Sequence, residues 1–227
     1  MMKKLLMMIV VLLPACGDSD VVGYDFRFAQ GPYGWQAGFA DYPLADAASY
    51  MLDSGHRALE PPLDSSRAAL YIAGTNRSDD LFMFYKREVA VRPSTRYRVR
   101  FEVEFASEVP SGCAGVGGAP GEGVTVKAGA SLEEPLAILA ADGMLRMNID
   151  KSNQSQGGRD ALVLGDIANS RSCEEPWQWE LKTLAGGSIE LTSDATGRVW
   201  LLVGTDSGFE SRTELYYTRF AARFEPF

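Results

Sequence analysis

Hydrophobic and polar side chains alternate along much of this chain with the two-residue period of a β-strand. The clearest case is residues 97–105, where every odd position is Tyr, Val or Phe and every even position is Arg or Glu. Because successive side chains of a strand point to opposite faces, this segment is predicted to bury one face and expose the other to water.

Further segments have the length and apolar content of strands, and clusters of Gly, Pro, Asp and Asn separate them. They are residues 24–28, 35–39, 68–73, 81–85, 124–128, 161–165, 177–182, 198–203 and 215–224. Residues 43–52 and 132–139 are candidates for a turn of helix, although neither has an amphipathic period. About ten strands joined by turns predict an all-β fold, an antiparallel β-sandwich or barrel with long loops.

Composition supports a single folded domain over residues 24–227 and narrows its chemistry. Of the 227 residues 46% are hydrophobic, which is enough for a core and excludes global disorder. The net charge of −8 argues against nucleic acid as a partner, because phosphate contacts need clustered Lys and Arg. The single His excludes a metal centre with two or three His ligands from one chain.

The first sixteen residues have the order of an export signal. Lys3 and Lys4 precede an apolar run over residues 5–13, which is too short for a bilayer span of about 20 residues. Residues 13–16, Leu-Pro-Ala-Cys, resemble the lipobox of bacterial lipoproteins, with Pro14 a departure from the more usual Ala or Ser. The alternative is an ordinary signal peptide followed by a chance Cys.

The lipobox resemblance implies a signal peptide over residues 1–15, a lipidated Cys16 carrying palmitate-type chains, and a short tether over residues 16–23. A lipid anchor would then join the protein to a membrane. Gly17 follows Cys16, so the Asp that would hold a Gram-negative lipoprotein in the inner membrane is absent from that position. The implied location is the bacterial cell envelope, at the outer membrane or cell surface rather than the inner membrane.

The two remaining cysteines, Cys113 and Cys173, form an even pair in an exported chain and are predicted to form a disulfide. The alternative is two reduced thiols, one of them catalytic. Cys113 is the second residue of a Gly-rich loop over residues 112–123. A Val-Thr-Val sequence follows this loop, so a helix and a phosphate site are not expected there, and the glycines are interpreted as packing beside the disulfide.

The order of the predicted strands resembles the β-jelly-roll of carbohydrate-binding modules and galactose-binding-like domains. The similarity is carried by the opening strand at 24–28, the Gly-Pro-Tyr-Gly-Trp turn at 31–35, the alternating mid-chain strand and the aromatic closing strand. It covers about residues 24–227 and is one of strand rhythm. It implies that the first and last strands pair, which places residues 24–28 beside residues 215–225.

Two polar loops, over residues 74–80 and 148–160, supply candidate binding groups. Amides and guanidinium groups hydrogen-bond sugar hydroxyls, and carboxylates bind hydroxyls or hard cations such as Ca²⁺. The candidate ligand-binding residues are Asn76, Asn153, Gln154, Gln156 and Arg159, and the candidate metal ligands are Asp79, Asp80, Asp150 and Asp160. The same residues are also typical of turns that bond to their own backbone.

Three tryptophans are candidates for stacking against a sugar ring: Trp35, Trp177 and Trp179. The last two are separated by one residue and would share a face of a strand. Most tryptophans of a sandwich belong to its core, so both interpretations stay open at this point.

We therefore expect a membrane-anchored, extracytoplasmic binding module for a glycan or similar polar ligand, without catalysis and with a structural Ca²⁺ as one candidate cofactor. Two alternatives remain. One is a lipoprotein that binds an envelope protein and no small ligand, and the other is a polysaccharide hydrolase with paired carboxylates. A Ser-His-Asp triad would need His56, and the sequence has no Gly-x-Ser-x-Gly element for its nucleophile.

Overall fold

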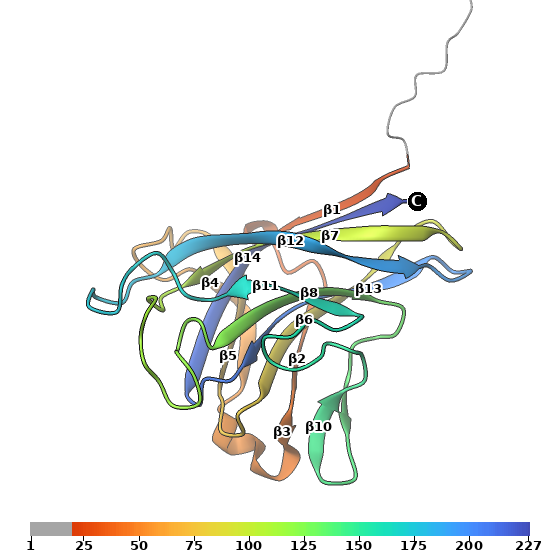
Figure 1. The fold of residues 1–227 in the computed structure, drawn as a ribbon. Helices are drawn as coiled ribbons and strands as arrows, with labels where there is room; N and C mark the ends of the chain where they lie inside the picture. Colours follow the sequence, from red (N-terminus) through yellow and green to blue (C-terminus); the bar gives the residue numbers. More distant parts are fainter. Residues whose placement is uncertain (1–19) are drawn as a thin grey trace, which may run out of the picture.

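The computed structural model describes residues 20–227, which form two antiparallel sheets packed face to face and a small third sheet (Figure 1). The six-stranded sheet has the order β12-β7-β14-β5-β4, with β1 also paired to β14, and the five-stranded sheet has the order β11-β8-β13-β6-β2. The three-stranded sheet has the order β3-β10-β9. The predicted antiparallel sandwich is confirmed.

The strands of the six-stranded sheet are β1 (Val22–Arg27), β4 (Asp53–Ala58), β5 (Ala68–Thr75), β7 (Arg96–Ser107), β12 (Glu180–Thr192) and β14 (Arg212–Pro226). Those of the five-stranded sheet are β2 (Gln36–Ala40), β6 (Leu81–Ala90), β8 (Val124–Ser131), β11 (Ala161–Asp166) and β13 (Arg198–Ser207). The three-stranded sheet has β3 (Tyr42–Pro43), β9 (Ala137–Leu139) and β10 (Met144–Met147), and two 3₁₀ helices are η1 (Phe28–Gln30) and η2 (Leu44–Tyr50).

The hydrophobic core lies between the two large sheets, and the strand β7 shows why. Its odd-numbered residues from Tyr97 to Phe105 are buried, while the charged residues between them lie on the outer face. The same arrangement continues on the neighbouring β14, where Tyr217, Phe220 and Phe224 are buried. The predicted two-faced strand at residues 97–105 is therefore confirmed.

The predicted pairing of the first and last strands is also confirmed. Strand β1 runs antiparallel to the second half of β14, with Val22 opposite Phe224 and Phe26 opposite Phe220. The start of β1 and the end of β14 consequently lie side by side at one end of the sandwich (Figure 1). The other strand beside this edge of β14 is β5, which pairs with its first half.

Several local predictions need correction. The strand expected over residues 177–182 begins only at Glu180, so Trp177 and Trp179 precede it. The helical turn expected over residues 132–139 is absent from this part of the structure, where β9 forms instead. The turn expected over residues 43–52 exists as η2. The polar sequence of β4 has no apolar alternation, and for this reason it was not predicted as a strand.

The segment between β8 and β11 covers part of the outer face of the five-stranded sheet. A second cluster of apolar residues forms there, in which Phe82, Phe84 and Leu202 of the sheet pack with Ile149 and Met147 of the covering segment. Beside this cluster, charged residues of the covering segment form ion pairs with charged residues of the sheet.

The disulfide between Cys113 and Cys173 is confirmed and joins two long loops at one end of the sandwich. Beside it, Gly117 has a φ of +73°, and a Cβ on it would lie 2.3 Å from the carbonyl oxygen of Gly208. The glycines of this loop thus allow close packing, as predicted, and strand β8 rather than a helix follows.

The predicted signal peptide and the lipidated Cys16 lie outside the residues that the structure describes. Within residues 20–227, no helix has the length and apolar character needed to cross a membrane.

Candidate functional site

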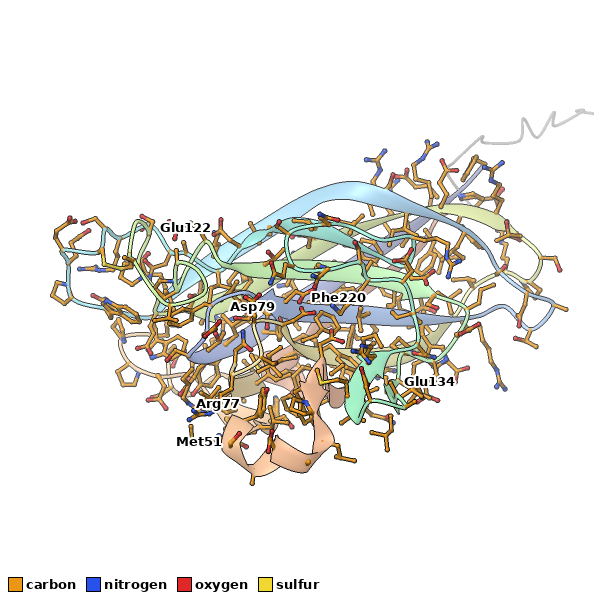
Figure 2. All side chains as sticks on the ribbon, turned by 60° about the horizontal axis from the view of Figure 1, so that its bottom comes forward. Met51, Arg77, Asp79, Glu122, Glu134 and Phe220 are labelled. Atoms are coloured by element: carbon orange, nitrogen blue, oxygen red, sulfur yellow. A yellow bond between two sulfur atoms is a disulfide. The ribbon has the colours of Figure 1, made fainter. Side chains whose placement is uncertain are left out.

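Two polar loops that are far apart in the sequence meet beside the five-stranded sheet. The amide Nε2 of Gln154 donates a 2.7 Å hydrogen bond to the carbonyl oxygen of Asp79. Figure 2 shows Asp79 near the middle of this face, and the neighbouring Arg77 donates to the carbonyl oxygen of Ser49 in η2. The structure therefore brings together the loops at residues 74–80 and 148–160, both of which the sequence marked as candidate binding segments.

A network of buried charges lies beneath these loops. Asp206 of β13 is fully buried, and its Oδ2 accepts hydrogen bonds from Lys127 Nζ at 2.7 Å and Lys151 Nζ at 2.9 Å. Lys151 Nζ also lies 2.8 Å from Oδ2 of Asp41. Asp80 completes the group, because oxygen atoms of Asp41, Asp80 and Asp206 lie within 4.8 Å of one another.

Burial and the neighbouring charges raise the pKa values of Asp41, Asp80 and Lys151 in this network. Burial, followed by the neighbouring Asp206, raises the pKa of Asp80 to about 7. Burial would lower the pKa of Lys151, but the charges of Asp206 and Asp41 outweigh it and raise that pKa. The carboxyl of Asp80 therefore keeps its proton in acidic solution and loses it near neutral pH.

The network does not have the form of a calcium site. Ca²⁺ takes about 6–8 oxygen ligands, whereas the ammonium groups of Lys127 and Lys151 already occupy the Oδ2 of Asp206. A divalent cation beside them would meet two positive charges within hydrogen-bond distance of its ligands.

The same network does not have the form of a glycosidase site. The two carboxyls of a retaining enzyme stand about 5–5.5 Å apart across an open cleft, and those of an inverting enzyme stand farther apart. Here Asp206 is fully buried and cannot reach a substrate. The small hollow above it, about 240 Å³ in volume, exposes Asp41 and Asp80 but not Asp206.

The predicted metal ligands Asp150 and Asp160 organise the loop itself. Asp150 accepts hydrogen bonds from the backbone of Ser152 and Arg159, and Asp160 accepts one from the backbone of Asp150. The Arg159 guanidinium pairs with Asp160 at 2.9 Å. Of the predicted set Asp79, Asp80, Asp150 and Asp160, the structure places only Asp80 in the three-aspartate group.

Among the predicted hydroxyl-binding residues, Asn76 is buried and serves the fold. Its Nδ2 donates to the carbonyl oxygens of Ser207 and Phe209 at 2.7 and 3.1 Å. Asn153, Gln156 and Arg159 are exposed on the covering loop, where a ligand can reach them.

The three candidate tryptophans have different environments. Trp35 is 6% exposed, and its ring lies against those of Phe26, Phe28 and Phe220 with centroids 4.9–5.9 Å apart. Trp179 is 9% exposed and packs edge-on against Tyr216. Trp177 is 50% exposed. Only Trp177 of these three presents a ring face that a sugar can stack on, and the shared face expected for the pair at 177 and 179 does not form.

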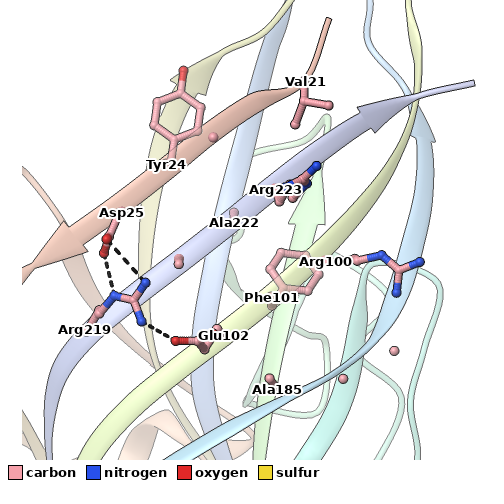
Figure 3. Close-up of a pocket in the computed structure, with 14 residues that line it drawn as sticks. Val21, Tyr24, Asp25, Arg100, Phe101, Glu102, Ala185, Arg219, Ala222 and Arg223 are labelled. Carbon is pink, nitrogen blue, oxygen red and sulfur yellow. Dashed lines mark hydrogen bonds and ion pairs between the residues drawn. The ribbon is translucent and has the colours of Figure 1, made fainter. Parts of the chain in front are cut away.

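A larger hollow crosses the outer face of the six-stranded sheet. This groove has a volume of about 760 Å³ and runs over β1, β14, β7 and β12 (Figure 3). Its floor consists of residues with small side chains or none, namely Gly23, Ala185, Gly186 and Ala221. Charged side chains rise around this floor, and they are Asp25, Arg100, Glu102, Arg219 and Arg223.

One side of the groove is held by a bridge of three charges. Arg219 Nε donates to Asp25 Oδ1 at 2.6 Å, and its Nη1 donates to Glu102 (Figure 3). The hydrogen bond from Arg219 lowers the pKa of Asp25, so this carboxyl stays ionised in neutral solution. Asp25 and Glu102, which lie opposite Ala221 on the two neighbouring strands, are thus linked through one guanidinium.

The other side of the groove carries two arginines. Arg100 Nε lies 3.3 Å from one oxygen of Glu225, and Arg223 Nε lies 2.9 Å from the other. Both arginine side chains are 55% exposed. The groove therefore combines guanidinium and carboxylate groups, which match the donors and acceptors of a polar ligand.

None of the predicted ligand residues lines this groove, and its residues were missed for a definite reason. Arg100 and Glu102 were recognised as the wet face of a strand, which is the usual role of such residues. Their juxtaposition with Gly23, Ala185 and Ala221 depends on the register of four strands. The one local signal is the pair Gly186-Gly187 inside a strand, since glycine there often marks a bulge or a close approach.

Comparisons with known proteins give no family for this chain. No family model matches it, and no curated protein matches it. Among solved structures, TmCBM61 in complex with β-1,4-galactotriose is similar, with 10% identity, a TM-score of 0.40, and coverage of 86% of this chain and 92% of that one.

A structure of carbohydrate-binding modules from the β-sandwich superfamily has 13% identity and a TM-score of 0.39, over 85% of this chain and 58% of that one. The K1 cleaved adhesin domain of Lys-gingipain from Porphyromonas gingivalis W83 has 12% identity and a TM-score of 0.35, over 89% and 97%.

Proposed function

We propose that this protein is an extracytoplasmic module that binds a glycan or similar polar ligand without catalysis. The observation that carries the proposal is the groove on the outer face of the six-stranded sheet. An antiparallel sheet covered on one face only normally presents a flat, ridged surface of long polar side chains to water. Here small residues on neighbouring strands leave a hollow long enough to cross four strands.

The groups around the hollow suit hydroxyl recognition. Carboxylates accept hydrogen bonds, guanidinium groups donate them, and a sugar ring offers both partners at adjacent carbons. Arg219, Asp25 and Glu102 hold one another in place, so a ligand would meet a preorganised set and would spend little entropy ordering it.

The test is to fill the groove and measure binding. The full chain, purified in mild detergent, is applied to a broad glycan array with and without EDTA. The variant Ala221→Trp places an indole on the groove floor, and Ala45→Trp, on the exposed surface of η2, is its matched control. Binding that Ala221→Trp abolishes and Ala45→Trp retains supports the groove.

Other results would redirect the proposal. Binding that EDTA removes would assign recognition to a metal-dependent site elsewhere, and binding that only Trp177→Ala removes would assign it to that exposed ring. If no glycan on the array binds the wild-type chain, the glycan-binding proposal fails.

We further propose that the protein is lipid-anchored through Cys16 at the outer membrane or cell surface. Support comes from the order of charge, apolar run and lipobox in residues 1–16. The tether leads into β1, next to the end of β14, so one end of the sandwich would face the membrane. Cys16→Ser should abolish incorporation of labelled palmitate and shift the protein from the membrane fraction to the soluble one. Unchanged labelling would exclude this anchor.

A specific observation also favours the alternative of an envelope-protein partner. Four large apolar side chains are exposed within residues 132–139, a segment that ends in the edge strand β9, and they are Leu132, Leu136, Ile138 and Leu139. Several exposed apolar groups within one short segment are a feature of many interaction surfaces. Ile138→Lys should then remove a partner that is cross-linked in intact envelopes, while the glycan binding of the groove stays unchanged.

A further inference from the structure

We propose that the ligand is an extended stretch of a linear polysaccharide, which occupies the groove together with a second hollow beside it. This second hollow is lined by Gln30, Arg67, Glu104 and Leu181, among others, and has a volume of about 340 Å³. The inference rests on the proposed glycan-binding function and adds the size and form of the ligand.

The second hollow adjoins the groove on the outer face of the six-stranded sheet. Arg219 lines both of them, so its side chain stands where one ends and the other begins. On β7, Glu102 lines the groove and Glu104 lines the second hollow. These two glutamates are consecutive residues on the same strand face, because side chains of a strand alternate between its faces.

The register of β1 on β14 arranges the two hollows end to end. Asp25 lies opposite Ala221 in the groove, and Arg27 lies opposite Arg219, where the second hollow begins. Together the hollows follow the six residues of β1, which span about 20 Å. A monosaccharide can occupy only one hollow at a time, whereas a linear chain can occupy both.

The second hollow offers the same kinds of polar group as the groove. The guanidinium of Arg67 can donate hydrogen bonds, and the carboxylate of Glu104 accepts one from Thr218 Oγ1 at 2.7 Å. Leu181, which is 41% exposed, adds an apolar side chain for the C–H groups of a sugar ring. A ligand with a repeating unit therefore meets donors and acceptors of one kind along the whole path.

Arg219 is placed to contact a ligand that passes from one hollow to the other. Its Nε and Nη1 donate to Asp25 and Glu102, which fixes the position of the guanidinium (Figure 3). The side chain is 26% exposed, so part of it remains accessible to a ligand. A chain that occupies both hollows has to cross this group, and the crossing adds a contact that neither hollow provides by itself.

An extended peptide of similar length fits this surface less well. Peptides commonly add to the free edge of a sheet, where unpaired backbone groups bind them. The two hollows lie instead on the face of the sheet, over strands β14 and β7, whose backbones pair with each other. Recognition here must come from side chains, and most of those around the second hollow are polar or charged.

The test measures affinity against chain length, on the full chain in mild detergent. The probes are cello-, manno- and galacto-oligosaccharides of two and of six units, together with hydroxyethylcellulose, mannan and galactan, and binding is followed by calorimetry. The variant Ala29→Trp fills the second hollow from the exposed surface of η1. Ala45→Trp makes the same change on the exposed surface of η2 and is the matched control. Arg67→Gln removes a donor from the hollow without adding volume.

A hexasaccharide should bind the wild-type chain at least about tenfold more tightly than the disaccharide of the same sugar. The corresponding polysaccharide should bind at least as tightly as the hexasaccharide. Ala29→Trp should remove most of the gain with length and leave disaccharide binding unchanged, and Arg67→Gln should reduce the gain. Ala45→Trp should behave as the wild type. The melting temperatures of the two Trp variants should agree, because both positions are exposed.

The other outcomes separate the inference from the function on which it rests. Equal binding of disaccharide and hexasaccharide, unchanged in Ala29→Trp, overturns the extended site and leaves glycan binding by the groove in place. Binding of oligosaccharides but not of the polysaccharide would indicate recognition of a chain end, and would also overturn it. Absence of binding to every saccharide overturns both proposals. Binding to a peptide array instead, lost in Ala29→Trp, would assign the two hollows to a protein partner.

Discussion

Replacing Asp206 by Asn is the sharpest test of the buried charge network. Asn keeps the shape of the side chain and removes its charge, so Lys127 and Lys151 lose the carboxylate that lies 2.7 and 2.9 Å from them. Lys151 retains Asp41 at 2.8 Å, whereas for Lys127 the carbonyl oxygen of Lys151 at 2.9 Å is the other close acceptor. The main cost is therefore an uncompensated, fully buried ammonium group on Lys127.

Removal of one partner from a buried ion pair typically costs about 3–5 kcal/mol. Asp80 reduces this cost, because without Asp206 beside it its carboxyl can ionise and supply the missing charge. We therefore expect a loss near the lower limit, about 3 kcal/mol in the free energy of unfolding. In a domain of this size each kcal/mol shifts the melting temperature by about 2–4 °C, which gives a decrease of about 6–12 °C.

The assay is thermal unfolding followed by circular dichroism at neutral pH, with two controls. Glu190→Gln removes an exposed carboxylate that also accepts from two cations, Arg96 and Arg98, each at 3.0 Å. Its effect should be small, because water and salt screen an exposed pair. The double variant Lys127→Met with Asp206→Leu should recover most of the lost stability, because it removes both buried charges. Equal effects of Asp206→Asn and Glu190→Gln would refute the reasoning.

Three further predictions follow from other contacts. The folded-state pKa of Asp80 is about 7, above its ordinary value of 3.8, so the folded protein binds the extra proton and wild-type stability should fall as pH rises from about 4 to 7. In denaturant unfolding from pH 4 to 8, the stability of Asp80→Asn relative to the wild type should increase by roughly 2 kcal/mol above pH 7, after allowance for screening. Parallel stability profiles of the two proteins would contradict this. Joint replacement of Cys113 and Cys173 by Ser should lower the free energy of unfolding by about 2–4 kcal/mol, because the disulfide is lost. A wild-type melting temperature that does not change when reductant is added would contradict this prediction. Trp35→Ala should lower the free energy of unfolding by about 3–5 kcal/mol because the ring is buried in the core. Trp177→Ala should leave the melting temperature unchanged, because this ring is half exposed. Retention of Trp177→Ala on a glycan affinity gel would show whether the exposed ring contributes to binding.

The fold was largely predictable because its main signal is local. Alternation over residues 97–105 specifies which face of β7 is buried, whatever strand lies beside it. Cysteine counting identified the disulfide, and the polar character of residues 74–80 and 148–160 identified two loops that the structure brings together. Strand β4 escaped prediction because its residues, Asp53–Ala58, are polar and form a strand only by pairing with β5.

The candidate sites depended on information that no local window contains. Trp35 and Trp177 are both followed by Gln in the sequence, yet one is in the core and the other is half exposed. Lys127 and Asp206 are 79 positions apart in the sequence. They form an ion pair only because their strands, β8 and β13, pair with each other.

The sequence by itself determined the all-β class, the buried face of β7 and the disulfide, and it predicts an export and lipidation signal. The tertiary structure decided the rest, namely the groove floored by Gly23, Ala185 and Ala221, the opposition of Arg100 and Arg223, and the buried ion pairs around Asp206. The physical reason is that alternation reports the environment of one strand, whereas a site is made by the register between strands. Register is set by backbone hydrogen bonds and core packing summed over the whole sheet.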